Sequence, residues 1–225
     1  MLKLFITATD TDAGKTYVAQ ALVNALVAEK NKVAVYKPIS AGCEMVNGTL
    51  INEDAKFLLQ QSNCQQSIEQ VNPIAFAPAI APHIAAEKEQ REITLADIEQ
   101  GYNQISMIEP DIIVCEGAGG WRLPLGKGKF LSKFVQATQQ QVILVVNMKL
   151  GCLNHAVLTY QSIISDGLQC VGWVANCQVD MPYLAENIAE LTTLLPMPKL
   201  AQLDFEPDIK KAALKIDLSP FTTPL

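Results

Sequence analysis

The segment at residues 8–16, Ala-Thr-Asp-Thr-Asp-Ala-Gly-Lys-Thr, constrains the fold of this chain more than any other segment does. It follows an apolar run at 4–6, which predicts a strand, and it leads into residues 15–29, which predict a covered helix. A turn of small residues ending in Gly-Lys-Thr between a strand and a helix is typical of a phosphate-binding loop. In such loops backbone N–H groups face phosphate oxygens, Lys15 would reach the outer phosphates, and the Thr16 hydroxyl can bind magnesium. The first glycine of the usual pattern would stand at Thr9, so the match is imperfect and an ordinary polar turn before a helix remains the alternative.

Composition limits the kinds of partner that we expect. The chain has 225 residues, of which 49% are hydrophobic, and no internal repeat, so we expect one domain over residues 1–225. The net charge of −6, without a block of Lys or Arg, argues against nucleic acid or an anionic membrane as the main partner. No apolar run approaches the roughly 18 residues of a spanning helix, and we recognise no signal peptide, so a cytoplasmic location is expected. The six cysteines show no CxxC pair or metal-ligand spacing, which favours buried or inert thiols.

Strand-like and helix-like segments alternate along the chain. Apolar runs at 33–36, 111–115, 142–146 and 170–175 predict further strands, and residues 52–59, 94–105, 130–139, 153–165 and 184–195 predict helices. Residues 72–83, with three prolines, are interpreted as a long functional loop, and the chain after residue 198 is only weakly patterned. The alternation predicts an α/β fold with a doubly wound, mainly parallel sheet and helices on both faces.

Polar residues stand where five predicted strands end. They are the segment at 8–16, Lys37 with Pro38, Glu116 with Gly117, residues 147–151, and Asn176. In open α/β sheets the right-handed crossovers bring all carboxyl ends of parallel strands to one edge, where ligands bind. We therefore expect these residues to converge on one site.

Acids and a second lysine at this edge are suited to phosphate chemistry. Asp12, Asp54 and Glu116 are candidates to complete a magnesium site with Thr16, because magnesium prefers a few oxygen ligands together with phosphate and water. The alternatives are a helix-capping or loop carboxylate for Glu116 and a first-turn acid for Asp54. Lys37 is interpreted as a second phosphate clamp, the alternative being a solvated loop lysine.

The remaining polar candidates are less specific. Residues 151–154 open a helix directly after a strand, where free N–H groups would hold a carboxylate, but ordinary helix capping is an equal alternative. The two histidines, His83 and His155, are too few for a zinc site and are expected to be packed or bonded within loops.

Together these segments resemble the dethiobiotin synthetase family, which has the P-loop NTPase type of fold. The resemblance rests on TDTDAGKT at 9–16, YKPISAG at 36–42, NEDA at 52–55, Pro73 and His83, EGAGGW at 116–121, VILVVNMKLGCLNHA at 142–156 and GWVAN at 172–176. This family places five residues, not four, before Gly14, which accounts for the unusual spacing. The resemblance implies that 7,8-diaminononanoate takes up CO2 as a carbamate, that ATP phosphorylates the carbamate, and that the second amine closes the ring of dethiobiotin with loss of phosphate.

The resemblance also implies residue roles. Lys15, Lys37 and Thr11 would be catalytic, and Thr16, Asp54 and Glu116 would bind Mg2+. The implied nucleotide-binding residues are Asp12, Ala13, Gly14, Lys15, Thr16, Tyr17, Asp54, Glu116, Gly117, Ala118, Gly119, Asn176, Cys177, Asp204, Phe205 and Glu206. Substrate would contact Ser40 and Ala41, and its carboxylate would be held in a homodimer by Gly151, Cys152, Leu153 and Asn154 of the other subunit.

Three positions depart from the family pattern. Ala8 replaces a usual glycine, which is harmless only if its φ is negative. Ala41 occupies the place of the usual substrate-loop serine, with Ser40 one residue earlier, and the segment at 199–208 lacks the usual residues of the base-binding turn. The main alternative function is a P-loop ATPase switch that acts on a macromolecule, although such proteins usually carry an additional early lysine that residues 8–13 lack.

Overall fold

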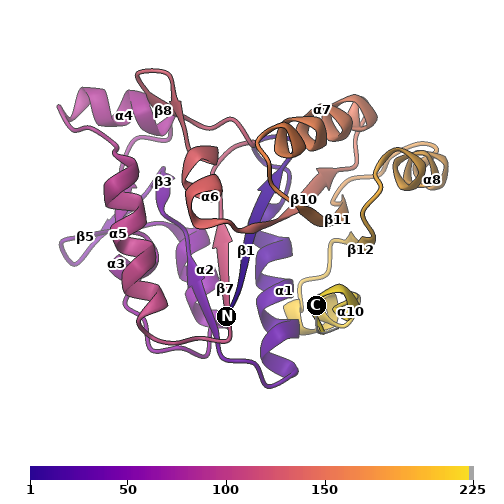
Figure 1. Cartoon of the computed structure of the whole chain (residues 1–225), viewed down its shortest axis with the longest axis horizontal. Coiled ribbons are helices and arrows are strands. Elements are labelled where there is room, and N and C mark those ends of the chain that lie inside the picture. The colour runs from indigo at the N-terminus through magenta and orange to yellow at the C-terminus, as the bar shows by residue number, and fades with distance from the viewer. Residues whose placement is uncertain (223–225) are drawn as a thin grey trace.

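The computed structural model describes residues 1–222 of the chain. Its centre is a six-stranded sheet in the order β12 (Lys199–Asp204), β11 (Cys170–Cys177), β10 (Gln141–Asn147), β1 (Leu2–Ala8), β7 (Ile112–Glu116) and β2 (Val33–Tyr36) (Figure 1). All neighbouring strands in this sheet are parallel. The predicted α/β fold with a parallel sheet is therefore confirmed.

Helices cover both faces of the sheet, and the central strands are therefore buried on both sides. In β1, Leu4 and Ile6 pack into a core with α1 (Lys15–Ala28), α2 (Glu53–Gln61), α3 (Ile68–Val71) and α9 (Ile209–Ala213). Phe5, from the opposite face of β1, packs into a core with α4 (Pro82–Lys88), α5 (Leu95–Ser106) and α6 (Ser132–Thr138). A third cluster lies between the sheet and α7 (Cys152–Ser165) and α8 (Leu184–Leu194), which lie at the opposite end of the molecule from α3 and α5 (Figure 1). This continuous burial explains the near-continuous apolar runs of the strands.

Three parts of the sequence contain more regular structure than predicted. The prediction of a long loop at 72–83 is wrong in part, because β6 (Ile74–Phe76) pairs in parallel with β3 (Ile39–Ala41) and α4 begins at Pro82. The helix predicted at 130–139 starts later, after the hairpin of β8 (Pro124–Gly126) and β9 (Lys129–Phe130). A second hairpin joins β4 (Glu44–Val46) and β5 (Thr49–Ile51).

The weakly patterned segment after residue 198 contains the sixth strand of the sheet. β12 pairs with β11, and its Leu200, Ala201 and Leu203 side chains are buried. Two short helices follow, α9 and α10 (Ser219–Thr222). The sequence therefore did not predict the edge strand β12, which ends at residue 204 and leads into the turn at residues 204–206.

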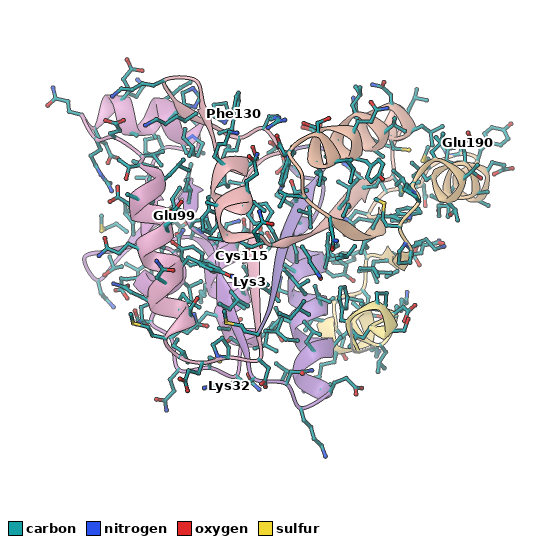
Figure 2. The ribbon with its side chains drawn as sticks, viewed as in Figure 1. Lys3, Lys32, Glu99, Cys115, Phe130 and Glu190 are labelled. Carbon is teal, nitrogen blue, oxygen red and sulfur yellow. The ribbon has the colours of Figure 1, made fainter. Side chains whose placement is uncertain are left out.

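Polar and apolar side chains separate as expected for a globular protein. Cys115 of β7 is buried in the interior, whereas Lys32 and Glu190 lie at the periphery (Figure 2). All six cysteines are free, and four of them are buried. None of the helices between residues 1 and 222 is long and apolar enough to cross a membrane.

Candidate functional site

The phosphate-binding loop lies between β1 and α1 as predicted. Ala8 is the last residue of β1, and within residues 1–222 it is not among the non-glycine residues with positive φ, so its Cβ causes no backbone strain. Gly14, with a φ of 80°, is the residue before α1. A Cβ at Gly14 would overlap the side-chain amide nitrogen of Asn176, so both the backbone angle and the close approach require glycine here.

Asn176 supports the loop from the end of β11. Its buried amide donates a hydrogen bond to the carbonyl of Ala13 at 2.8 Å and accepts one from Gln178 Nε2 at 2.8 Å. The structure thus brings Asn176 to the underside of the loop, with both ends of its amide engaged by protein groups. The neighbouring Cys177 is buried and pairs in register with Asp204 of β12.

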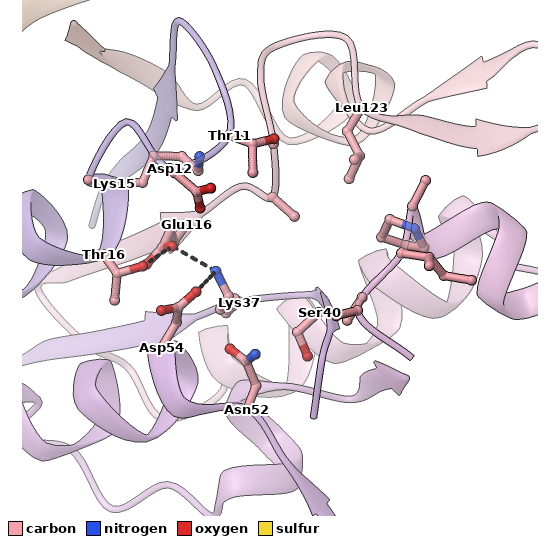
Figure 3. A pocket seen from close by; sticks show the side chains of 18 of the residues that line it. Thr11, Asp12, Lys15, Thr16, Lys37, Ser40, Asn52, Asp54, Glu116 and Leu123 are labelled. Carbon is pink, nitrogen blue, oxygen red and sulfur yellow. Dashed lines mark hydrogen bonds and ion pairs between the residues drawn. The ribbon is translucent and has the colours of Figure 1, made fainter. Parts of the chain in front are cut away.

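A compact charged cluster joins the ends of β2 and β7 to the starts of α1 and α2. Lys37 Nζ lies 2.7 Å from Glu116 Oε1 and 3.3 Å from Asp54 Oδ2, and the Thr16 hydroxyl donates to Glu116 Oε1 at 2.8 Å (Figure 3). Lys37 and Glu116 are buried, whereas Asp54 is partly exposed. The hydroxyl, the two carboxylates and the lysine, which the sequence predicted as candidates in separate segments, therefore meet at one place.

The local structure explains how Asp54 and Lys37 are held. Asn52 is the N-cap of α2, and its side chain accepts from the N–H of Ala55, which places Asp54 in the first helical turn. The Lys37 N–H donates to the carbonyl of Val71, and the Lys37 carbonyl accepts from Asn72 Nδ2 at 2.7 Å, so the lysine backbone is fixed on both sides. These contacts fix the backbone of Lys37, so that its ammonium group lies at the cavity.

The two lysines differ in their protonation equilibria. Burial disfavours the charged form of Lys37, but the Glu116 and Asp54 carboxylates outweigh this effect and raise its pKa above the ordinary value. Burial lowers the pKa of Lys15, and the Lys37 charge lowers it further, although Glu116 opposes the shift. Lys15 Nζ donates to the carbonyl of Asp10 at 3.3 Å.

A cavity of about 950 Å³ opens beside this cluster. It is large enough for a nucleotide or a comparable ligand. The predicted site residues that line it are Thr11, Asp12, Gly14, Lys15, Thr16, Lys37, Ser40, Ala41, Asp54, Glu116, Ala118 and Gly119. Ala13 and Gly117 lie behind this surface, where the Ala13 carbonyl accepts from Asn176 and the Gly117 N–H donates to the carbonyl of Ile6 at 3.0 Å.

Several lining residues were not predicted as site residues. Asn52, Leu123 and Gln178 line the cavity, as do residues 79–82 at the start of α4. The proline-rich composition of residues 72–83 was the one signal that pointed to the last group. Asn52 was predicted only as a helix start, and Leu123 and Gln178 carried no signal because single apolar and amide residues occur throughout such chains.

Ser40 and Ala41 both line the cavity but differ in what they offer. The buried Ser40 hydroxyl donates to Asn72 Oδ1 at 2.6 Å and lies 3.1 Å from Cys43 Sγ. Ser40 thus already has protein partners for its hydroxyl, whereas Ala41 offers only its backbone and methyl group.

The turn at residues 204–206 lies against α1. The Tyr17 hydroxyl accepts from the N–H of Glu206 at 3.0 Å and lies within hydrogen-bond distance of the carbonyls of Asp204 and Glu206, at 3.2 and 3.1 Å. The Tyr17 ring is stacked on Phe205 with centroids 6.4 Å apart. The structure therefore brings this predicted group next to the phosphate-binding loop through Tyr17.

The start of α7 lies outside the cavity. Gly151 precedes the helix with a φ of 93°, Cys152 is buried, Leu153 is half-buried and Asn154 is exposed. In the described part of the chain, none of these four residues lines the cavity. The segment is tied to the phosphate-binding loop, because Lys149 Nζ lies 3.1 Å from Asp10 Oδ2 and the N–H of Asn147 donates to Thr9 Oγ1 at 3.3 Å. The Lys149 side chain lowers the pKa of Asp10, and burial only partly opposes this.

Comparisons with known proteins give one consistent result. A family model described as an AAA domain matches residues 2–213. An ATP-dependent dethiobiotin synthetase of Alteromonas mediterranea is 45% identical over 95% of this chain and 97% of its own, and one of Cellvibrio japonicus is 48% identical over 87% of this chain and 86% of its own. A third, of Pseudomonas aeruginosa, is 41% identical over 98% of both chains. Among solved structures, the MinC:MinD cell division complex of Aquifex aeolicus aligns with a TM-score of 0.56 at 15% identity, over 95% of this chain and 86% of that chain.

Proposed function

The chain belongs to the ATP-dependent dethiobiotin synthetase family, and on this basis we propose the reaction that it catalyses and the residues that carry it out. It is a P-loop enzyme of the ligase class that uses ATP as co-substrate. The proposed reaction joins 7,8-diaminononanoate and CO2, with hydrolysis of ATP to ADP and phosphate, to give dethiobiotin. The observation that carries the proposal is the buried Lys37, held between Glu116 and Asp54 on a cavity that Lys15 also lines.

The charges of the cavity suit the proposed steps. One substrate amine adds to CO2 to give a carbamate, a carbamate oxygen takes the γ-phosphoryl group of ATP, and the second amine then attacks the carbamate carbon and expels phosphate. Negative charge accumulates on the carbamate and on the phosphoryl oxygens that are transferred. Lys15 and Lys37 would neutralise it in a partly dry cavity, where such contacts are stronger than in water.

Magnesium is proposed to bind at Thr16, Asp54 and Glu116. Glu116 Oε2 is buried, and no hydrogen-bond partner for it is found in residues 1–222, although a buried carboxylate oxygen normally has one. A hydroxyl and two carboxylate groups, with phosphate oxygens and water, form a donor set that suits Mg2+. Residues 1–222 contain no group of three or more His, Cys, Asp or Glu that would hold a metal without a nucleotide. The ion would neutralise phosphate charge.

Tyr17, Asn176 and the turn at residues 204–206 are proposed to form the base side of the nucleotide site. Support comes from the contacts of Tyr17 with the turn and from the contact of Asn176 with the phosphate-binding loop. Ser40 and Ala41 are proposed to contact the diamine, with Thr11 on the opposite side of the cavity (Figure 3).

The functional unit is proposed to be a cytoplasmic homodimer of a single-domain chain. The four residues at the start of α7 are not among the cavity-lining residues of the described chain, which supports a role in the cavity of a second subunit. Six free cysteines suit a reducing compartment. One continuous sheet with cores on both faces supports one domain, of which residues 223–225 lie outside the described part.

Substrate-dependent turnover tests the reaction. ATP hydrolysis should require both 7,8-diaminononanoate and bicarbonate. Mass spectrometry should detect a product whose formula is that of the diamine with one C=O group added and two hydrogen atoms removed. A diamine acetylated on both amines serves as the control and should not stimulate hydrolysis. Hydrolysis that ignores the diamine and responds to a macromolecule would favour the ATPase switch instead.

A further inference from the structure

Asp166 stands at the end of α7, far along the chain from the site, and accepts three hydrogen bonds from one short segment. Its Oδ2 accepts from Trp121 Nε1 at 2.9 Å and from Arg122 Nη1 at 2.7 Å, and its Oδ1 accepts from Arg122 Nη2 at 3.0 Å. The Asp166 side chain is 11% exposed. A largely buried carboxylate with a bidentate arginine and an indole donor is a rigid attachment point.

The segment attached to Asp166 forms one wall of the cavity. Glu116, Ala118 and Gly119 line the cavity before the attachment, and Leu123 lines it directly afterwards. Arg122 has a second partner, because the same Nη1 also donates to Ser132 Oγ at 3.0 Å. Trp121 and Arg122, which Asp166 holds, are not among the described cavity-lining residues and lie between Gly119 and Leu123, which are.

A chain of packed groups leads from Trp121 to Glu116. The Trp121 ring is buried and meets the Phe5 ring edge to face, with centroids 6.0 Å apart. Phe5 in turn lies so close to Gly117 that a Cβ on this glycine would be 2.9 Å from Phe5 Cζ. The position of Trp121 therefore limits where Phe5 lies, and Phe5 limits where the backbone next to Glu116 can run.

We propose that Asp166 is a positioning residue for the reaction, which acts through Trp121 and Arg122 on the cavity wall at residues 116–123. The inference rests on the proposed function, because the wall that it positions carries Glu116. Loss of the attachment frees the middle of this segment, so that the Glu116 carboxylate no longer has one fixed position relative to Thr16 and Lys37. A small displacement of such a group is enough to slow a reaction that depends on orientation.

Asp166→Asn tests the proposal, with Asp111→Asn as the matched control. Asp111 directly precedes β7, the strand that ends at Glu116, and its Oδ2 accepts from the N–H of Lys32 at 2.8 Å. For Asp166→Asn we expect kcat/KM to fall roughly 10- to 100-fold and the magnesium concentration for half-maximal rate to rise. For Asp111→Asn we expect kcat/KM and the magnesium requirement to remain at the wild-type values, whatever the change in Tm.

Fluorescence provides a measurement that does not depend on turnover. The chain has two tryptophans, and Trp173→Phe leaves Trp121 as the single emitter. In this background Asp166→Asn should shift the Trp121 emission to longer wavelength and increase its quenching by acrylamide. If Asp166→Asn leaves kcat/KM, magnesium requirement and Trp121 emission unchanged, Asp166 serves stability alone and the proposal is wrong. A wild-type protein without diamine-dependent turnover would refute the proposed function, while the emission experiment would still decide whether Asp166 positions the wall.

Discussion

Lys37 and Glu116 illustrate how the demands of the proposed reaction and of folding combine in single residues. Each is buried, and each is the main charge partner of the other. Removing one member of a buried pair leaves an uncompensated charge, which costs more than the pair itself contributes. We therefore expect Lys37→Ala to lower the free energy of unfolding by about 3 kcal/mol and to reduce kcat by roughly 100-fold or more. Chemical denaturation and the coupled ATP assay measure the two effects.

A double variant separates these two effects. Lys37→Ala combined with Glu116→Gln leaves no charge of this pair in the interior, so much of the lost stability should return while the enzyme stays inactive. If the double variant is no more stable than Lys37→Ala, the cost lies in packing and not in the unpaired Glu116.

At Gly14 in the phosphate-binding loop, the structure leaves no room for a side chain. Gly14→Ala combines an unfavourable φ of 80° with overlap against Asn176, and the Asn176–Ala13 hydrogen bond has to break to make room. We expect ATP affinity to fall by at least roughly tenfold, as a loss of 1.4 kcal/mol or more implies. Isothermal calorimetry with ATP and magnesium provides the measurement.

Gly48 provides the control for backbone strain. It has a similar φ of 86°, but apart from its two chain neighbours no described residue has an atom within 4 Å of the position that its Cβ would take. Gly48→Ala should therefore cost about 1 kcal/mol of stability and leave ATP affinity unchanged. Equal ATP affinities for the two variants would mean that the contact with Asn176 does not shape the loop.

At the scale of elements, Tyr17 joins α1 to the turn after β12. Tyr17→Phe removes the hydroxyl that accepts from Glu206 and preserves the ring against Phe205. Loss of about 1 kcal/mol of hydrogen bonding predicts a roughly fivefold higher KM for ATP with kcat unchanged. Inhibition by tripolyphosphate, which has no base, should be the same in both proteins. If tripolyphosphate also binds more weakly, Tyr17 acts on the phosphate-binding loop and not on the base side.

The sequence predicts the helices and strands that have a clear hydrophobic pattern of their own. It does not predict the short strands that form only because they pair with another strand. Residues 142–146 are apolar without interruption, which predicts a buried strand on its own. The strands β12 and β6 are stabilised by pairing with other strands, β11 and β3, and their own sequences are short and mixed. Propensity in so short a segment is weaker than the gain from completing a sheet edge.

The same distinction holds for the site. The convergence of Thr16, Lys37 and Glu116 was predictable, because parallel strands place their carboxyl ends at one edge whatever their lengths. Asp54 was predicted only as a candidate magnesium ligand in a first helical turn, and it reaches the site from the start of α2, which follows the antiparallel β4–β5 hairpin. The attachment of Asp166 to Trp121 and Arg122 was not predictable from the sequence. It depends on the length and direction of α7, because these determine whether Asp166, at the end of this helix, lies next to the segment after β7. Sequence patterns specify strand ends, whereas contacts between helix ends and loops follow from packing.

At the scale of the whole molecule, the question is how many chains make one active site. If the start of α7 serves the cavity of the other subunit, a chain defective at Asn154 and a chain defective at Lys37 supply each other's missing part. In the proposed two-fold symmetric dimer the interface would be isologous, so a mixed dimer would contain one site with both defects and one site with neither. Each single variant alone has two damaged sites.

Co-expression of Asn154→Ala and Lys37→Ala chains with different affinity tags tests this arrangement. The mixed dimers, isolated by sequential purification on the two tags, should recover about half of the wild-type rate per dimer, because one of two isologous sites is intact. Each parent dimer should remain at the low rate of its own defect. If Asn154 instead served the cavity of its own chain, every site in the mixed dimer would carry one defect, and the measured rate would equal the mean of the two parents. The ratio of these rates therefore distinguishes a shared site from two separate ones even if Lys37→Ala lowers stability, because the mean of the parents carries the same loss.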